Sequence, residues 1–201
     1  GTLDADLCLD FSIISGDVGA YERIETSLKA AGYRMVEGES WRWTGGRGRR
    51  VQVEFFCPAG PGREPGRLHR PKGVVGARLS ALALATGELI DADRIEKEID
   101  IDLPAGGGRA RIPIQVVGPA GFLAAKVDAL RRREKNKDAY DIVWLTEAWG
   151  NGPRGLARCI REGPLGRHGG FQAIVRQLGD AFEGIEAVGP VRYAAFLAPQ
   201  N

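Results

Sequence analysis

The sequence predicts a mixed α/β fold with a helical C-terminal region, and two kinds of periodicity carry this prediction. Alternating apolar and polar residues near the N-terminus indicate strands, most clearly at residues 51–56. Apolar residues at intervals of three and four indicate helices, which dominate the C-terminal part. A length of 201 residues allows one domain, or one domain with a helical appendage. We therefore expect a strand-rich core over residues 1–117 and a helical region over residues 118–201.

In the N-terminal part, strands are expected to alternate with one helix. The alternating segments predict strands at residues 3–9, 33–36, 41–44 and 51–56. A helix is expected over residues 17–31, because its apolar residues fall on one stripe and Gly32 follows as a C-terminal cap. Residues 58–71 are rich in Pro, Gly and Arg, which is typical of a loop, and residues 74–86 fit a strand or a helix.

Two more strands are expected before the helical region begins. Residues 91–102 hold six acids and are expected to form a solvated strand or edge region, and residues 110–117 are expected to form a strand. A helix is predicted over residues 119–133, with Pro in its first turn. After a short break, a second helix covers residues 138–149. The remainder is expected to be helical, most clearly at residues 171–182.

Composition and charge exclude several classes of protein. Hydrophobic residues make up 43% of the chain and charged residues 27%, as in globular proteins. No apolar run in the sequence approaches the ~18 residues of a membrane span. The 28 basic and 26 acidic residues nearly balance, so net charge neither requires nor excludes nucleic acid as a partner. Cys8, Cys57 and Cys159 fit neither a disulfide framework nor a zinc site, and we expect a reducing cytoplasm.

Three carboxylates form a candidate metal site. Asp4 and Asp6 lie two positions apart on one predicted strand, so their side chains share a face, with Cα atoms roughly 7 Å apart. Glu54 lies on the polar face of another predicted strand. If the two strands are neighbours, the carboxylates would lie within about 4–7 Å of one another and suit Mg²⁺ or Mn²⁺. Such a cluster serves phosphoryl or nucleotidyl transfer, whereas ordinary solvated strand ends are the alternative for the aspartates.

A lysine and an aspartate each occupy an apolar stripe on one of two successive helices. Lys126 shares helical spacing with Leu123 and Leu130, and Asp141 shares a stripe of the same spacing with Asp138, Ile142 and Leu145. A lysine in an apolar stripe must reach solvent or meet an anion. A helical hairpin would bring Lys126 near Asp141, either as a structural salt bridge or as a lysine aimed at a substrate phosphate.

Basic residues cluster at residues 47–50, 63–72 and 131–137, and the last cluster holds five bases and one acid. These clusters are either ordinary solvated charge or an attraction for a polyanion such as RNA. Trp41 and Trp43 offer a stacking surface for bases, with core packing as the alternative. Neither His69 nor His168 has a ligand partner at a metal-binding spacing, so both are expected at the surface.

Two segments resemble a known family. The stretch Gly1-Thr2-Leu3-Asp4-Ala5-Asp6-Leu7 resembles the T-x-D-x-D-l segment of AbiEii/MenT-type nucleotidyltransferases, in the polymerase-beta-like superfamily. Residues 125–142 match the pattern K-x-x-A-L…R…K-D-a-Y-D-i that is characteristic of the family. The resemblance covers roughly residues 1–147. It implies a mixed-sheet nucleotidyltransferase core with a helical C-terminal region.

The resemblance also implies roles for residues of the N-terminal part. Asp4 and Asp6 match the metal-binding pair, and Glu54 holds the place of the third carboxylate, where Asp is commoner. Thr2 matches the hydroxyl residue beside the nucleotide phosphates. Members of the family carry a Gly-Gly or Gly-Ser phosphate loop before this segment. Since the sequence starts at Gly1, we expect that loop to be missing from it.

The resemblance further implies the reaction. Lys126 matches the lysine that contacts the triphosphate, and Asp141 matches its accompanying acid. The implied activity is metal-dependent transfer of an NMP from an NTP to an acceptor hydroxyl, with release of pyrophosphate. In the family this chemistry often serves a toxin, with the 3′ end of a tRNA as acceptor and a cognate antitoxin as partner. Transfer to a small molecule such as an aminoglycoside, or a non-catalytic module that binds RNA or a protein, are the alternatives.

Overall fold

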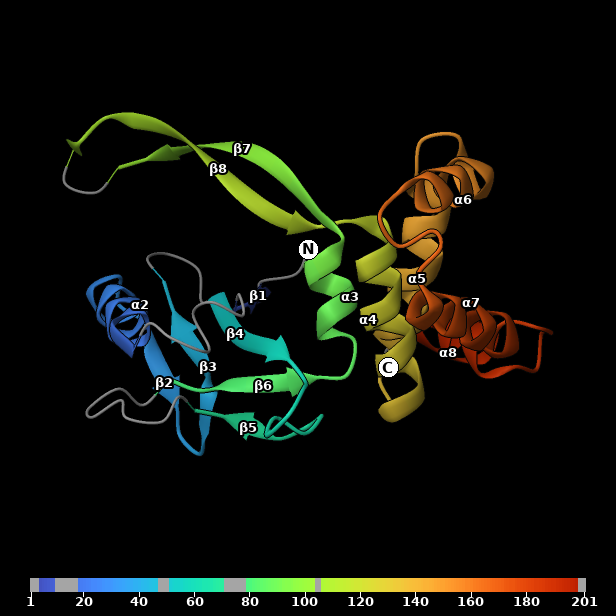
Figure 1. Ribbon diagram of the computed structural model, residues 1–201, viewed down its shortest axis with the longest axis horizontal. Helices are drawn as coiled ribbons and strands as arrows, with labels where there is room; N and C mark the ends of the chain where they lie inside the picture. Colours follow the sequence, from blue (N-terminus) through green and yellow to red (C-terminus); the bar gives the residue numbers. More distant parts are fainter. Residues whose placement is uncertain (1–3, 10–17, 47–50, 71–78, 104–105, 199–201) are drawn as a thin grey trace. The chain divides into compact units, whose positions relative to one another are not determined.

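The computed structural model describes residues 4–9, 18–46, 51–70, 79–103 and 106–198 (Figure 1). The chain divides into two compact units, Gly1–Glu88 and Leu89–Asn201. The first unit is built on a mixed sheet and the second mostly on helices. The mixed α/β class predicted from the sequence is therefore confirmed. The strands after residue 93 fall within the second unit, whereas the sequence groups them with the core.

Among the described residues, the first unit consists of a six-stranded sheet and helix α2. Its elements are β1 (Asp4–Cys8), α2 (Val18–Ala30), β2 (Arg34–Val36), β3 (Glu39–Gly45), β4 (Val51–Pro58), β5 (Leu68–His69) and β6 (Ala81–Leu84). The main path runs β2-β3-β4-β6-β5, and β1 also pairs with β4. Strand β4 is antiparallel to β3 and parallel to both β1 and β6. Strand β4 is therefore the centre around which the sheet is organised.

At β4, one face of the sheet is apolar and the other carries polar side chains. Val53, Phe55 and Cys57 are buried at alternate positions and pack against Trp43 and Tyr21 in the core of this unit. The segment 74–86, left open by the sequence, contributes strand β6, although residues 74–78 lie outside the described residues. The short β5 lies within the segment expected as a loop. A two-residue strand gives no periodicity to detect.

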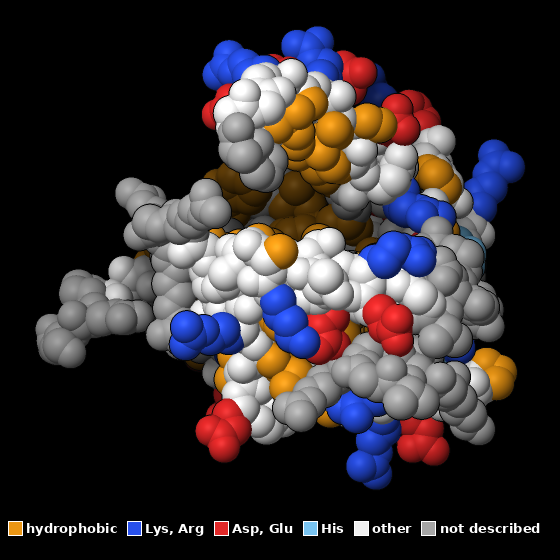
Figure 2. All heavy atoms as spheres, turned by 90° about the vertical axis from the view of Figure 1, so that its left-hand side faces the viewer, with side chains coloured by type: hydrophobic (Ala, Val, Ile, Leu, Met, Phe, Trp, Pro, Cys, Tyr) orange, Lys and Arg blue, Asp and Glu red, His pale blue; other side chains and the backbone are white. Residues whose placement is uncertain are grey.

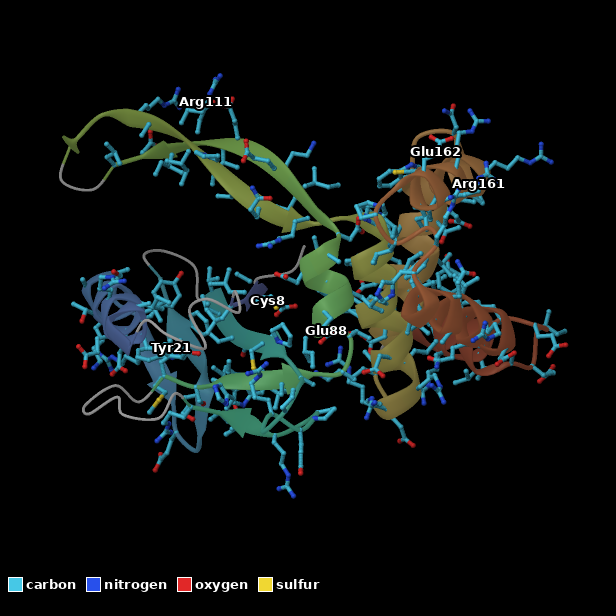
Figure 3. The ribbon with its side chains drawn as sticks, in the orientation of Figure 1. Cys8, Tyr21, Glu88, Arg111, Arg161 and Glu162 are labelled. Atoms are coloured by element: carbon cyan, nitrogen blue, oxygen red, sulfur yellow. The ribbon has the colours of Figure 1, made fainter. Side chains whose placement is uncertain are left out.

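Tyr21 lies on α2 (Figure 3). Its side chain is fully buried, and its hydroxyl has no hydrogen-bond partner among the described residues. Burial, helped by the charge of Cys57 and opposed by Arg63, raises the pKa of Tyr21 to about 12. An unfolded tyrosine ionises near pH 10, so the unfolded state loses this proton first and stability falls as pH rises from 10 towards about 12.

We expect Tyr21→Phe to leave the free energy of unfolding at pH 7 within about 1 kcal/mol of the wild type, because no hydrogen bond of the hydroxyl is lost. The same variant should abolish the Tyr21 contribution to alkaline destabilisation. Tyr21→Ala should lose about 3–5 kcal/mol through the cavity that it leaves. Urea unfolding at pH 7 and pH 11 measures all three effects. A large loss in Tyr21→Phe would show that the hydroxyl is bonded after all.

The second unit joins a two-stranded ribbon to a group of helices. Its elements are β7 (Arg94–Asp102), β8 (Arg109–Val117), α4 (Pro119–Arg132), α5 (Asn136–Ala148), α6 (Gly152–Glu162), α7 (Gly169–Ala181) and α8 (Val188–Leu197). Helix α4 packs against α5, α6 and α7, and α5 packs against α8. A short helix, α3 (Gly87–Ala92), precedes the ribbon and was not expected, because six residues show too little periodicity. The helices expected around residues 119–133 and 138–149 are confirmed.

The ribbon of β7 and β8 has one charged face and one aliphatic face. Cross-strand pairs join Arg111 to Asp100 at 2.9 Å and Arg109 to Asp102 at 3.2 Å on the charged face. Figure 3 shows Arg111 projecting from β8. Arg94–Asp102 of the acid-rich segment is thus an exposed strand, as the sequence predicts, whereas Asp91 and Ala92 end α3 and Asp93 is buried.

Asp93 caps the start of α4. Its carboxylate Oδ2 accepts a hydrogen bond from the Gly121 N–H at 2.8 Å, and its backbone oxygen accepts one from the Gly118 N–H at 2.6 Å. A Cβ on Gly118 would lie 2.6 Å from the Asp93 carboxyl group, so this position requires glycine. The negative charge also interacts favourably with the helix N-terminus. Asp93 thereby fixes where the helix that carries Lys126 begins.

None of the helices in the described part of the chain is long and apolar enough to cross a membrane. Cys57 and Cys159 are free cysteines. Figure 3 places Cys8 on β1.

Candidate active site

The pairing of β1 with β4 brings two of the candidate metal ligands to neighbouring strands. The strands run parallel, with the Cα of Asp6 opposite Glu54 and the Cα of Asp4 opposite Gln52. Alternate residues of a strand share a face, so positions 4, 6, 52 and 54 lie on the face opposite Val53 and Phe55. The neighbouring strands that the candidate site requires are therefore present.

The distance between the three carboxylates stays a prediction. The side chain of Asp4 and the whole of Thr2 lie outside the described residues. Within the described ranges, no group of three His, Cys, Asp or Glu side chains is close enough to hold a metal ion. The backbone register places Asp6 and Glu54 together, and the position of Asp4 follows from the same strand.

The carboxylate of Glu54 is held by two neighbours. Its Oε1 accepts hydrogen bonds from Arg42 Nε at 2.7 Å and from Gln52 Nε2 at 2.6 Å. The Glu54 side chain is 15% exposed, so these contacts are partly shielded from water. Neither contact was predicted: the Arg42 contact depends on the register between β3 and β4, and alternation along β4 shows only that Gln52 and Glu54 share a face.

Arg42 is itself fixed from several sides. Its Nη1 donates to Glu39 at 2.5 Å, and its guanidinium lies over the Trp41 ring, 4.5 Å from the ring centroid. Burial lowers the pKa of Arg42, but the charges and hydrogen bonds of Glu54 and Glu39 outweigh this and raise it above its ordinary value. Trp43, in contrast, is buried in the core. The two tryptophans thus have different uses, and Trp41 stacks on a protein cation.

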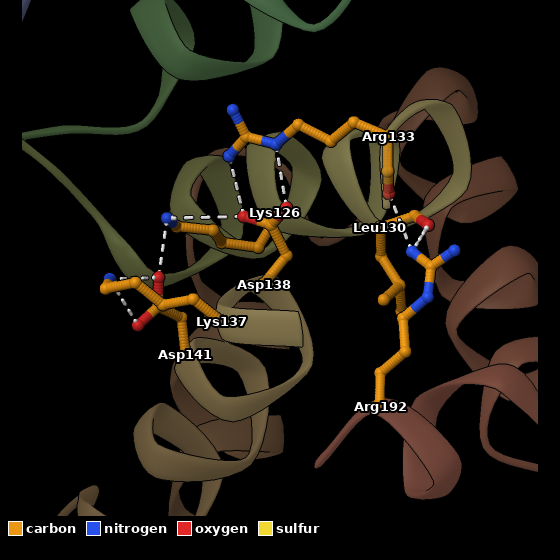
Figure 4. Close-up of polar contacts among 7 residues, drawn as sticks. All are labelled: Lys126, Leu130, Arg133, Lys137, Asp138, Asp141 and Arg192. Carbon is orange, nitrogen blue, oxygen red and sulfur yellow. Dashed lines mark hydrogen bonds and ion pairs between the residues drawn. The ribbon is translucent and has the colours of Figure 1, made fainter. Parts of the chain in front are cut away.

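Lys126 meets Asp141 across the hairpin of α4 and α5, with 2.7 Å between Nζ and Oδ2 (Figure 4). The contact expected from helical spacing is confirmed. The Lys126 side chain is 20% exposed, while Leu123 and Leu130 on the same stripe are buried. A charged nitrogen in this setting needs an anionic partner, and Asp141 supplies it.

A second carboxylate, Asp138, completes this cluster. Arg133 donates to both of its oxygens, at 2.7 and 2.8 Å, and Lys126 Nζ lies 3.8 Å from Oδ1. Lys137 Nζ also reaches Asp141, at 2.8 Å. The Asp138 side chain is only 2% exposed, so its negative charge requires these cations. Three cations surround two carboxylates, and the surplus positive charge suits an anionic ligand such as a phosphate.

Arg192, from α8, supports the same cluster. Its Nη1 donates to the backbone oxygens of Leu130 and Arg133, both at 2.7 Å, where α4 ends (Figure 4). These oxygens lack partners within the helix, so Arg192 acts as a side-chain cap from another element. Helix α8 is held in place by the stacking of Tyr193 on Tyr140 of α5. No pattern in the sequence indicates this role of Arg192.

Several bases in the cluster at residues 131–137 have local carboxylate partners. Arg132 pairs with Asp128 at 2.7 Å, and Arg133 and Lys137 pair with Asp138 and Asp141. The cluster at residues 47–50 lies outside the described residues, as does Lys72. On the face shown in Figure 2, Lys and Arg side chains are interspersed with Asp and Glu side chains rather than gathered together. The described residues therefore show a weaker concentration of positive charge than the sequence implies.

His168 is exposed, as expected, but His69 is partly buried. Burial and then the charge of Arg63 lower the pKa of His69, which keeps it neutral at pH 7. The expectation of a surface position was wrong for His69, because the pairing of β5 with β6 places it beside Ala81.

Comparison with known proteins identifies the family. Residues 9–200, nearly the whole chain, match the family described as nucleotidyl transferase AbiEii toxin, type IV TA system. The matched residues include Glu54, Lys126 and Asp141, whereas Asp4 and Asp6 precede them. No curated protein and no solved structure gives a significant match. The chain belongs to the AbiEii nucleotidyl transferase toxin family of type IV toxin–antitoxin systems.

Proposed function

We propose that the chain is a metal-dependent nucleotidyltransferase that moves an NMP from an NTP to an acceptor hydroxyl and releases pyrophosphate. Family membership supports the reaction class. The observation that carries the metal dependence is the parallel pairing of β1 with β4, which sets Asp6 opposite Glu54 on the face away from the core.

The residues present fit a hard divalent cation. Carboxylate oxygens are the ligands that Mg²⁺ and Mn²⁺ prefer, and the Oε2 atom of Glu54 accepts no hydrogen bond from the described residues. Asp4, Asp6 and Glu54 would hold the metal. When bound, such ions neutralise phosphate charge and align the attacking oxygen.

Lys126 is proposed to bind the β- and γ-phosphates of the NTP, with Asp141 orienting its ammonium group. The 2.7 Å contact fixes Lys126, and the surplus cation of the cluster leaves positive charge for the substrate. Thr2 is proposed to contribute its hydroxyl beside the phosphates, by its position in the T-x-D-x-D segment. These groups bind and orient the nucleotide, so their contribution is positional and electrostatic.

The proposed acceptor is the 3′ end of a tRNA, and the proposed partner is a cognate antitoxin protein. A toxin of this family must modify a molecule that the cell needs, and a tRNA meets that requirement. Arg131 and Lys135 are exposed bases next to the Lys126 cluster and support a polyanionic acceptor. Three cysteines that lie far apart in the sequence are consistent with a reducing cytoplasm, where both partners would be found.

The test supplies the protein with Mg²⁺, each of the four α-labelled NTPs in turn, and either tRNA or an aminoglycoside. We expect label on tRNA with at least one NTP, and loss of that label with EDTA or when the 3′-terminal hydroxyls are oxidised beforehand. Label on the aminoglycoside alone would establish the small-molecule rival. Absence of transfer with every acceptor, together with absence of metal binding, would establish a non-catalytic module.

A further inference from the structure

The two oxygens of the Glu54 carboxylate lie in different environments. Oε1 accepts two hydrogen bonds, from Arg42 Nε at 2.7 Å and Gln52 Nε2 at 2.6 Å. Oε2 accepts none from the described residues. A carboxylate held through one oxygen presents the other in a fixed direction.

We propose that Gln52 and Arg42 are positioning residues that hold Glu54 so that its Oε2 is directed at a divalent cation. This inference rests on the proposed function, because it assumes the metal site of Asp4, Asp6 and Glu54. It adds two residues that neither the family pattern nor the sequence singles out. Neither residue is proposed to touch the metal.

The energetic reason is the freedom of a glutamate side chain. Ordering such a long side chain costs rotamer entropy. Two hydrogen bonds to one oxygen remove that freedom before the metal arrives, so less of the binding free energy is lost. Partners that orient metal ligands in this way commonly change metal affinity by about 10–100-fold when they are removed.

Gln52 is well placed for this role. It lies two residues before Glu54 on the same face of β4, and its Cα pairs with that of Asp4 on β1. Its amide is neutral, so it orients Glu54 without repelling a nearby cation.

Arg42 adds rigidity rather than mobile charge. Its guanidinium is bound by Glu39 as well as by Glu54 and is stacked on Trp41, so three groups fix its position. The carboxylate of Glu39 offsets its charge, which limits repulsion of a cation at Oε2. A lysine cannot reproduce the planar arrangement in which Nε and Nη1 serve two carboxylates at once.

The experiment measures Mn²⁺ binding to the full chain by electron paramagnetic resonance of the free ion. The variants are Gln52→Leu and Arg42→Lys, with Asp6→Asn as the reference that removes a proposed ligand. The ribbon provides matched controls, since Gln115 donates to Glu96 at 3.1 Å and Arg111 Nε donates to Asp100 at 2.9 Å. Gln115→Leu and Arg111→Lys make the same chemical changes on an exposed ribbon.

We expect the Kd for Mn²⁺ to rise by about 10–100-fold in Gln52→Leu and in Arg42→Lys, and to stay unchanged in both controls. Thermal melts verify folding, and Gln52→Met replaces Gln52→Leu if the latter is unfolded. Wild-type binding that is lost in Asp6→Asn but unchanged in folded Gln52 and Arg42 variants would overturn the positioning role alone. No saturable binding by the wild type would overturn the proposed metal site, and this inference with it.

Discussion

Asp6→Asn is expected to lower nucleotide transfer by about 10³-fold or more while the protein stays folded. The variant keeps the shape of the side chain but removes the charge that a shared metal needs. A metal contributes several kcal/mol to the transition state, about 4 kcal/mol for a loss of 10³-fold. Asp6 is exposed on β1, so the substitution should leave the core intact. Labelled-nucleotide transfer, measured beside a thermal melt, gives both quantities.

Asp102→Asn is the matched control for this change. Asp102 is an exposed carboxylate on the ribbon, paired with Arg109 at 3.2 Å. Its variant should transfer nucleotide at the wild-type rate. Equal activity in the Asp6 and Asp102 variants would show that Asp6 takes no part in the reaction and that the Asp4–Asp6 pair is an ordinary solvated strand end.

Lys126→Ala is expected to lower transfer by about 10²–10³-fold, because it removes a fixed positive charge aimed at the phosphates. The fold should survive, since alanine is tolerated on the apolar stripe of α4. Asp141→Asn should also lower activity by freeing Lys126, and should lose about 1–3 kcal/mol of stability, because two lysines lose their charged partner. Transfer assays and melts on the same preparations separate the two effects.

Lys137→Ala tests whether the salt bridge itself matters. Lys137 pairs with the same carboxylate at 2.8 Å, but its side chain is 51% exposed. An ion pair whose lysine is this exposed contributes about 1 kcal/mol at most, so this variant should keep its stability and lose much less activity than Lys126→Ala. If Lys126 were merely structural, Lys126→Ala would lose activity only in proportion to the unfolded fraction. Full transfer by a folded Lys126→Ala protein would establish that structural role.

The sequence predicted the features that depend on periodicity. Spacing on α4 and α5 was sufficient to pair Lys126 with Asp141, because two helices joined by a short break usually pack against each other as an antiparallel hairpin. Alternation on β4 was likewise sufficient to place Glu54 on the face opposite Val53. In both cases one element fixes the direction of its own side chains, and the neighbouring element is close in sequence.

Most of the contacts that the sequence did not predict join residues that are distant in the chain or depend on the register between two strands. Arg192 caps α4 from a helix some sixty positions later, and Arg42 reaches Glu54 only once β3 and β4 align, whereas Gln52 contacts Glu54 along β4 itself. Nor does a run of bases reveal which members are paired, as Arg133 and its bidentate contact with Asp138 illustrate. Such partners are chosen by packing, and local patterns carry no information about them.

The hydrogen bond from Gly118 to Asp93 has a consequence for how the chain can change in evolution. The ribbon begins directly after Asp93 and ends directly before Gly118, and a backbone hydrogen bond links these two residues. The cap on α4 is thus complete without any residue of the ribbon. Insertions or deletions in the ribbon alter the entropy of a closed loop, which depends only weakly on length. The ribbon is therefore a replaceable insertion, free to vary in length and sequence while the lysine-bearing helix keeps its starting point.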